Sequence, residues 1–134
     1  MNPETIRNWL QKADNDMKIA KDQMQTKDPV TDMVCFHMQQ ACEKYLKTFL
    51  ISRGSEYPRT HDIGALIDAC ARLDPDFRVL EGWGVDTLTA YAVELRYSED
   101  FFMPSEEETK AAIELGEKVR EFVLGKLRER GFQP

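Results

Sequence analysis

Apolar residues recur at intervals of three and four along most of the chain, which is the pattern of amphipathic α-helices. The pattern is broadest in residues 30–50, where one apolar arc is formed by Val34, Met38, Ala41, Cys42, Tyr45 and Phe49. An arc of this width predicts that the helix contacts more than one neighbour. We therefore predict that 30–50 is the central helix of a bundle, begun by the Asp-Pro pair at 28–29 and ended by Gly54.

Two further long helices are predicted towards the ends of the sequence. The first spans 3–25 and starts at an Asn-Pro pair, because asparagine can cap a helix and proline suits its first turn. Asp14 and Asp16 are expected on its polar side, away from the core. The last helix spans 105–131, starts with a Ser-x-x-Glu capping box and is ended by Gly131. Short linkers favour antiparallel neighbours.

The stretch between the central and the last helix contains shorter predicted elements. A helix over 60–73 has Thr60 as its cap and ends before an Asp-Pro pair. Residues 76–84 are predicted to be irregular or a short turn. A further helix over 85–97 is followed by a loop over 98–104.

Together these elements predict an all-α fold, an antiparallel up-and-down bundle of four to five helices. No strand alternation or internal repeat competes with this interpretation. A chain of 134 residues with 42% hydrophobic residues supports one full core but not two ordinary domains, so 1–134 is predicted to be a single domain. The residues expected to be mostly buried are Trp9, Met38, Tyr45, Leu66, Leu88, Leu95, Val119 and Phe122.

Composition narrows the classes of function. A formal net charge of -6 disfavours coverage of a long nucleic-acid backbone, although a local pocket can still hold one nucleotide. No stretch approaches about 18 apolar residues and the N-terminal sequence lacks a signal core, so a cytoplasmic protein without a membrane segment is expected. The 3 cysteines fall in apolar helical patterns and are expected in the core. No phosphate loop or metal-ligand spacing is present, and we expect neither a cofactor nor a metal site.

Candidate chemistry lies at the border of the apolar arc of 30–50. Steps of three and four residues place one line of polar side chains there, here called the polar stripe: His37, Gln40, Lys44 and Lys47. The stripe can be a ligand-binding face. It can equally be the solvated margin of a core helix, since a lone histidine beside an apolar face is usually structural.

Three segments carry a resemblance to a known family. They are FHMQQACEKYLKTFL at 36–50, THDIGALI at 60–67 and LRYSED at 95–100. Their order and spacing resemble the HEPN domain, a family named for nucleotide binding in higher eukaryotes and prokaryotes. The resemblance implies a helical bundle, commonly a homodimer, that is frequently associated with a separately encoded minimal nucleotidyltransferase.

The sequence departs from the pattern of the HEPN ribonucleases. Their motif is an arginine and a histidine separated by about four to six residues, and Arg96 resembles that arginine in position. However, residues 101–103 read Phe-Phe-Met, and neither His37 nor His61 follows an arginine at that interval. Without an imidazole to transfer the proton, attack by a ribose hydroxyl loses its evident acid or base. The resemblance therefore implies the fold more strongly than ribonuclease activity.

The first functional hypothesis is a noncatalytic module that binds a nucleotide, such as ATP, or presents a substrate to a nucleotidyltransferase, in some cases within a toxin-antitoxin pair. Arg96 would hold a phosphate through its planar fork and Tyr97 would stack or donate a hydrogen bond. The further donors are expected to be His37, Gln40, Lys44 and His61. The structural alternatives are an ion pair of Arg96 with Glu94 or Glu99, a solvated Lys44, and a capping or packing role for His61.

Two hypotheses from other classes stay open. One is a metal-independent endoribonuclease toxin in which His37 or His61 replaces the missing histidine across a dimer. The other is an assembly subunit that binds a partner protein and no small ligand. A homodimer is expected in each case, because Trp83, Phe101 and Phe102 lie in polar-flanked loops that a monomer covers poorly.

Overall fold

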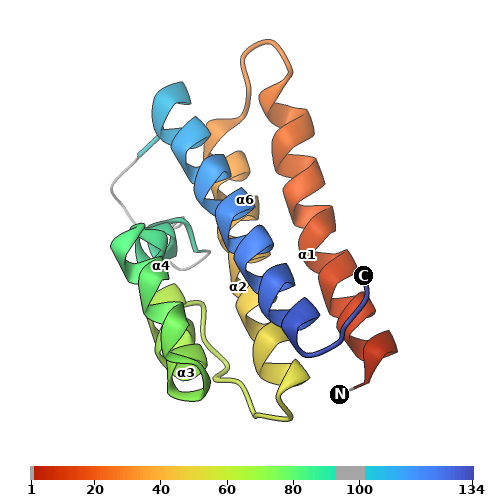
Figure 1. Cartoon of the computed structure of the whole chain (residues 1–134). Helices are drawn as coiled ribbons and strands as arrows, with labels where there is room; N and C mark the ends of the chain where they lie inside the picture. The colour runs from red at the N-terminus through yellow and green to blue at the C-terminus, as the bar shows by residue number, and fades with distance from the viewer. Residues whose placement is uncertain (1, 93–101) are drawn as a thin grey trace.

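The computed structural model describes residues 2–92 and 102–134, and within these ranges every regular element is helical. The long helices of the described residues are α1 (Pro3–Met24), α2 (Thr31–Ser52) and α6 (Glu106–Glu129). Figure 1 shows α1 running antiparallel to α2, and α6 running in the same direction as α2. The all-α helical bundle predicted from the sequence is confirmed.

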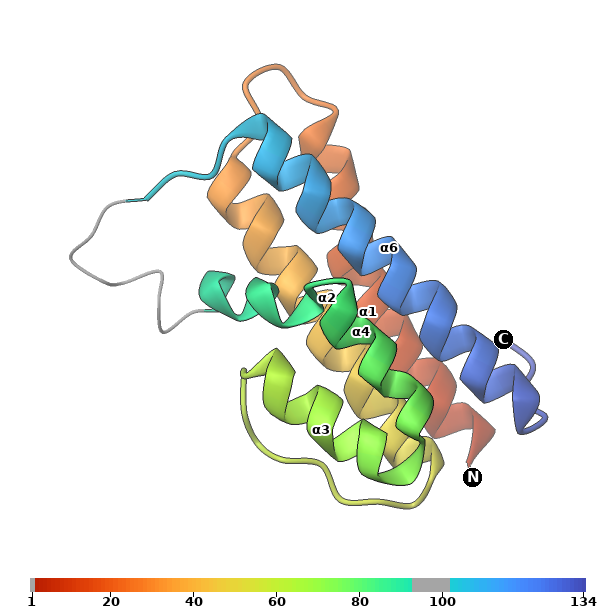
Figure 2. The same ribbon diagram turned by 60° about the vertical axis from the view of Figure 1, so that its left-hand side comes forward.

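Shorter elements complete the described part of the chain on one side of α2. They are α3 (Ile63–Leu73), η1 (Pro75–Arg78), α4 (Val79–Gly82) and η2 (Val85–Tyr91). Figure 2 shows this layer against the side of α2 that α1 leaves open. Because α2 contacts α1, α6, α3 and η2, the prediction that it is the central helix is confirmed.

Several predicted helix ends are confirmed by their hydrogen bonds. The Asn2 side chain accepts from the backbone N–H of Glu4 at 3.0 Å, and Ser105 accepts from Glu108 N–H at 3.0 Å. Gly131 follows α6 with a φ of 90°, a left-handed conformation that glycine adopts without steric cost. These contacts satisfy backbone groups that a helix end leaves without partners.

Two predicted caps are wrong. Asp28 has a φ of 54° and stands in the α1–α2 loop, where Gln23 Oε1 instead accepts the N–H of Val30 at 3.1 Å. Thr60 also lies before the helix that it was expected to cap. The N-cap of α3 is Asp62, whose side chain accepts from Ala65 N–H, because the third N–H of the helix lies within its reach.

The helix predicted over 85–97 is not formed as such. The structure has a 3₁₀ helix that ends at Tyr91, and Ala92 takes an extended conformation with ψ 157°. One cause is that Thr89 Oγ1 accepts the N–H of Ile63, which fixes this segment against the start of α3. Residues 93–97 lie outside the described residues.

The core lies on all sides of α2 except its outward face. Met38, Tyr45, Leu66, Leu88 and Val119 are buried as predicted, and Leu95 lies outside the described residues. All three cysteines are free and buried. Trp9 and Phe122 are also mostly covered, although less completely than these residues. Their rings form edge contacts at the margin of the core, with Tyr57 at 5.5 Å for Trp9 and with Phe77 at 4.9 Å for Phe122.

Gly116 permits the close approach of α6 to α2. A methyl group added there would overlap Cε of Met38, a side chain that is fully buried. Gly125 lies on the same helix with nothing within 4 Å of such a methyl group. Alanine at Gly125 would change only the helix propensity, whereas alanine at Gly116 would change both the helix propensity and the packing of the core.

We expect Gly125→Ala to raise the free energy of unfolding by about 0.5–1 kcal/mol, because glycine is a poor residue for a helix interior. Gly116→Ala gains the same propensity but overpacks the core, which costs about 1–3 kcal/mol. Urea unfolding of both variants measures the difference. Equal stabilities would contradict the packing argument.

Lys126 links the end of α6 to η1. Its side chain is 10% exposed, and Nζ lies 2.8 Å from Asp74 Oδ2 and 2.5 Å from Asp76 Oδ2. Burial by itself raises the pKa of Asp74. The hydrogen bonds from Lys126 and from the N–H of Asp76 outweigh it, so the pKa is lowered from its ordinary value.

A carboxyl whose pKa is lowered by folding stabilises the fold above its unfolded pKa, and this contribution is lost as pH falls through the folded value. We therefore expect Lys126→Met to lose roughly 1 kcal/mol of stability near neutral pH, and less as the pH falls through the lowered pKa of Asp74. Urea unfolding at several pH values tests this. The control is Lys118→Met, which removes a lysine from the same helix. A deficit that does not depend on pH would exclude the ion pair as its cause.

Candidate functional site

The polar stripe of α2 occupies the outward face of that helix. His37, Gln40, Lys44 and Lys47 are all half-buried, whereas the opposite face packs Met38 against α6. Contacts from α1 border the stripe on one side, and the segment before α3 borders it on the other. The stripe therefore lies between these two borders, on the part of α2 that is only partly covered.

One carboxylate of α1 holds two residues of the polar stripe. Asp16 Oδ1 lies 2.8 Å from His37 Nδ1, and Lys44 Nζ donates to Asp16 Oδ2. Asp16 is 9% exposed, so the prediction that it lies on the solvated side of the first helix is wrong. Its burial is possible because both oxygens have charged or polar partners. His37 and Lys44 are thereby brought together at one point, although seven positions separate them in the sequence.

A second buried carboxylate, Glu43, also holds one histidine and one lysine. It lies six residues after His37 on α2. Glu43 is 4% exposed, and its two oxygens lie 2.8 Å from His61 Nδ1 and 3.3 Å from Lys47 Nζ. Gln39 holds the backbone of the same histidine, because its Nε2 donates to the carbonyl of His61 at 2.9 Å. Gln40 in turn donates to Gln39 Oε1 at 2.6 Å. His61 is fixed at its ring and at its main chain.

The geometry determines which ring nitrogen each histidine presents. An ionised carboxylate only accepts hydrogen bonds, so Nδ1 of His37 and of His61 must carry a hydrogen. Among the described residues, no protein group bonds to Nε2 of either ring. The exposed fraction of the side chain is 22% for His37 and 42% for His61. Nε2 is therefore the ring nitrogen that remains available to a ligand.

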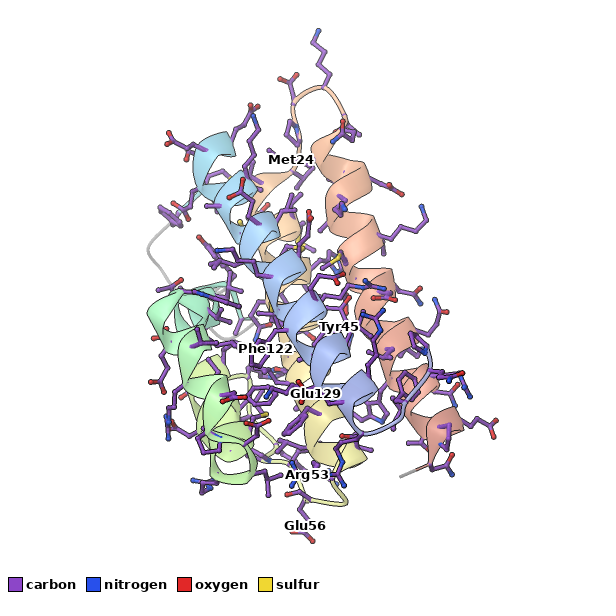
Figure 3. All side chains as sticks on the ribbon, in the orientation of Figure 1. Met24, Tyr45, Arg53, Glu56, Phe122 and Glu129 are labelled. Carbon is purple, nitrogen blue, oxygen red and sulfur yellow. The ribbon has the colours of Figure 1, made fainter. Side chains whose placement is uncertain are left out.

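A third carboxylate lies beside the candidate site and is structural. Tyr45 donates to Asp14 Oδ1 at 2.5 Å, and Arg120 Nε donates to the same oxygen at 2.9 Å. Figure 3 shows Tyr45 between the long helices. Burial and the hydrogen bond to Asp14 raise the pKa of Tyr45 above its ordinary value, so the phenol stays protonated. The cluster joins α1, α2 and α6.

The structure brings four of the predicted site residues together in two pairs. His37 and Lys44 share Asp16, while Gln40 and His61 are joined through Gln39. Arg96 and Tyr97 lie outside the described residues. Sequence reasoning missed the anchors Asp16, Gln39 and Glu43. In the sequence, each of these residues stands only next to the apolar arc of its own helix. Many exposed polar residues stand in the same position, so this does not distinguish a buried anchor.

A family model for the HEPN domain matches residues 6–127. The chain belongs to the HEPN family. The crystal structure of an archaeal HEPN homologue superimposes on this HEPN domain with a TM-score of 0.65 and 21% sequence identity. The match covers 91% of this chain and 97% of that one, so the two share the fold over almost their full lengths. No curated protein matches the sequence.

The described residues of this HEPN domain contain no cluster of metal ligands and no helix that could span a membrane. No three histidine, cysteine, aspartate or glutamate side chains gather there in a way that could hold a metal ion. Within the same residues, no helix combines the length and the apolar character that crossing a bilayer requires.

We expect nitrogen NMR spectra to show that both neutral imidazoles carry hydrogen on Nδ1, because a carboxylate accepts there. The measurement is simple, since the chain contains only 2 histidines. Asp16→Ala should change the signals of one histidine, and Glu43→Ala should change those of the other. A wild-type spectrum in which hydrogen resides mainly on Nε2 would exclude these pairs in solution.

Proposed function

We propose that this HEPN domain binds a phosphate-bearing ligand, a nucleotide, on the outward face of α2. The observation that carries the proposal is the pairing of His37 and Lys44 on the buried carboxylate of Asp16. This pairing places the Lys44 ammonium beside the His37 ring, which donates to an anion from Nε2 when both ring nitrogens carry hydrogen. Gln40 and His61 extend the donors along the helix, and Arg96 and Tyr97 add a planar fork and an aromatic ring.

The buried carboxylates lower the entropic cost of binding. Lys44 is a long side chain that loses rotamer freedom when a ligand immobilises it. Here Asp16 already restrains its ammonium, and Glu43 restrains Lys47 in the same way. A phosphate then meets donors that are in place, while each carboxylate keeps the lysine that neutralises it.

The spacing of the two histidine pairs favours binding over cleavage. Positions 37 and 43, which anchor the pairs, are separated by about 9 Å of helix rise. An acid and a base acting on one phosphodiester must both reach the reacting atoms within hydrogen-bond distance. Two pairs set this far apart suit successive groups of an extended ligand better than one reacting phosphorus.

Ribonuclease activity remains the second candidate function for one specific reason. An imidazole whose Nδ1 bonds a buried carboxylate, and whose Nε2 has no bond from the described residues, has the arrangement of a general base. His37 and His61 both show it. In a dimer, one pair from each copy would supply the base and the acid.

The cellular location and the partners are a further part of the proposal, based on the family resemblance. We propose a cytoplasmic homodimer that works with a separately encoded nucleotidyltransferase, in some cases as a toxin-antitoxin pair. Phe102 and Met103 support an interface, since their exposed fractions of 63% and 48% are high for large apolar residues. Light scattering of the purified protein tests the dimer, and copurification with the product of an adjacent nucleotidyltransferase gene tests the partner.

Calorimetric titration with ATP tests the binding function. We expect Lys44→Ala to weaken binding by roughly 10-fold or more, because a hydrogen bond to a charged group contributes about 1.5–3 kcal/mol. Lys18→Ala is the matched control, since Lys18 is an exposed lysine of α1 that pairs only with Asp22 among the described residues. Equal affinities of the two variants would place the ligand elsewhere.

RNA incubation separates the two candidate functions. If the domain only binds, single-stranded and structured RNAs stay intact in its presence. Cleavage that disappears in His37→Ala or in Arg96→Ala would establish the ribonuclease in place of the binding module. Loss of ATP affinity in Arg96→Ala without any cleavage by the parent would instead assign Arg96 to the phosphate.

A further inference from the structure

A small groove lies between α1 and α2 next to the candidate site. Its volume is about 180 Å³, and it is lined by Ile19, Ala20, Gln23, Val30, Met33, Val34 and His37. The exposed fractions of Ile19 and Val30 are 53% and 48%, high values for aliphatic side chains. Apolar surface of this kind gains free energy when a ligand removes it from water. Its volume is below the range for drug-sized ligands and suits a single ring system.

His37 belongs both to this α1–α2 groove and to the phosphate donors. Its ring lines the groove, while its Nδ1 bonds Asp16 at the carboxylate that also holds Lys44. The apolar groove therefore adjoins the charged donors, and His37 is the residue that they share. A ligand with a flat apolar part and an anionic part can occupy both at once.

Gln23 adds a hydrogen-bond donor to the wall of the groove. Its Oε1 accepts from Val30 N–H at 3.1 Å and from the hydroxyl of Thr26 at 3.0 Å. With the oxygen held by these donors, Nε2 is the amide atom left to donate to a ligand in the groove. The ring nitrogens of a nucleobase are acceptors that such an amide can bind.

We propose that the α1–α2 groove holds the base of a nucleotide whose phosphate lies against His37 and Lys44. This assignment rests on the proposed phosphate site and names the ligand as a single mononucleotide unit. The aliphatic walls contact the faces of the base, and Gln23 contacts its edge. The charged end of the same ligand lies at the Asp16–Lys44 pair.

Calorimetry with the full chain tests the base and phosphate contributions separately. The probes are adenosine 5′-monophosphate, which carries both parts, and ribose 5-phosphate, which lacks the base. We expect the nucleotide to bind about 10-fold more tightly than the sugar phosphate. Ile19→Ser should reduce this ratio to about twofold while leaving ribose 5-phosphate binding unchanged, because serine removes apolar contact without adding charge.

Val79→Ser is the matched control, because Val79 is a 42% exposed valine on α4, outside the lining of the groove. It should leave both affinities unchanged. Lys44→Ala should weaken both probes by similar factors. If Lys44→Ala changes neither affinity, the proposed phosphate site fails.

If Lys44→Ala weakens both probes but the nucleotide has no advantage over ribose 5-phosphate, the groove assignment alone is wrong. It is also wrong if Ile19→Ser keeps the full ratio. A change from dimer to monomer in Ile19→Ser, with the ratio intact, would identify the groove as a contact between two copies of the chain and would overturn the base assignment.

Discussion

A carboxylate withdrawn from water must keep its partners, because the transfer of an unpaired charge into a protein interior costs several kcal/mol. Asp16 and Glu43 meet this requirement by the same means, with a histidine nitrogen on one oxygen and a lysine ammonium on the other. The positions of His37 and His61 follow from it. The face that we assign to ligand binding is thus organised by negative charges beneath it, which fix the orientation of the donors above.

The bundle explains why this face belongs to α2. That helix is packed by α1, by α6 and by the layer of α3 and η2, so only a narrow outward strip of it meets solvent. Gly116 lets α6 lie close on the opposite side. Since α2 is held on every other side, side chains on its outward strip rest on a rigid support, which is the condition for placing donors accurately.

Local signals predicted the long helices well, because their ends depend on nearby residues such as Asn2, Ser105 and Gly131, which act within one turn. Prediction failed where a distant contact decided the outcome. Thr89 binds the start of α3, and the predicted helix over 85–97 is instead a 3₁₀ helix over its first seven residues. Asp16 looked like a surface residue because its partners come from another helix. The periodicity of α2 therefore predicted which polar side chains share one face, whereas the carboxylates that hold them were not predictable from it.

The parallel course of α2 and α6 has a consequence for the rest of the chain. Parallel helices begin at the same end of a bundle, so the segment between them must travel back along its length, as long crossover connections do in other bundles. The described part of this returning segment belongs to the core, because α3 and η2 both pack against α2. A change of length there would displace buried side chains such as Leu66 and Leu88, whereas the α1–α2 loop has only to reverse the direction of the chain.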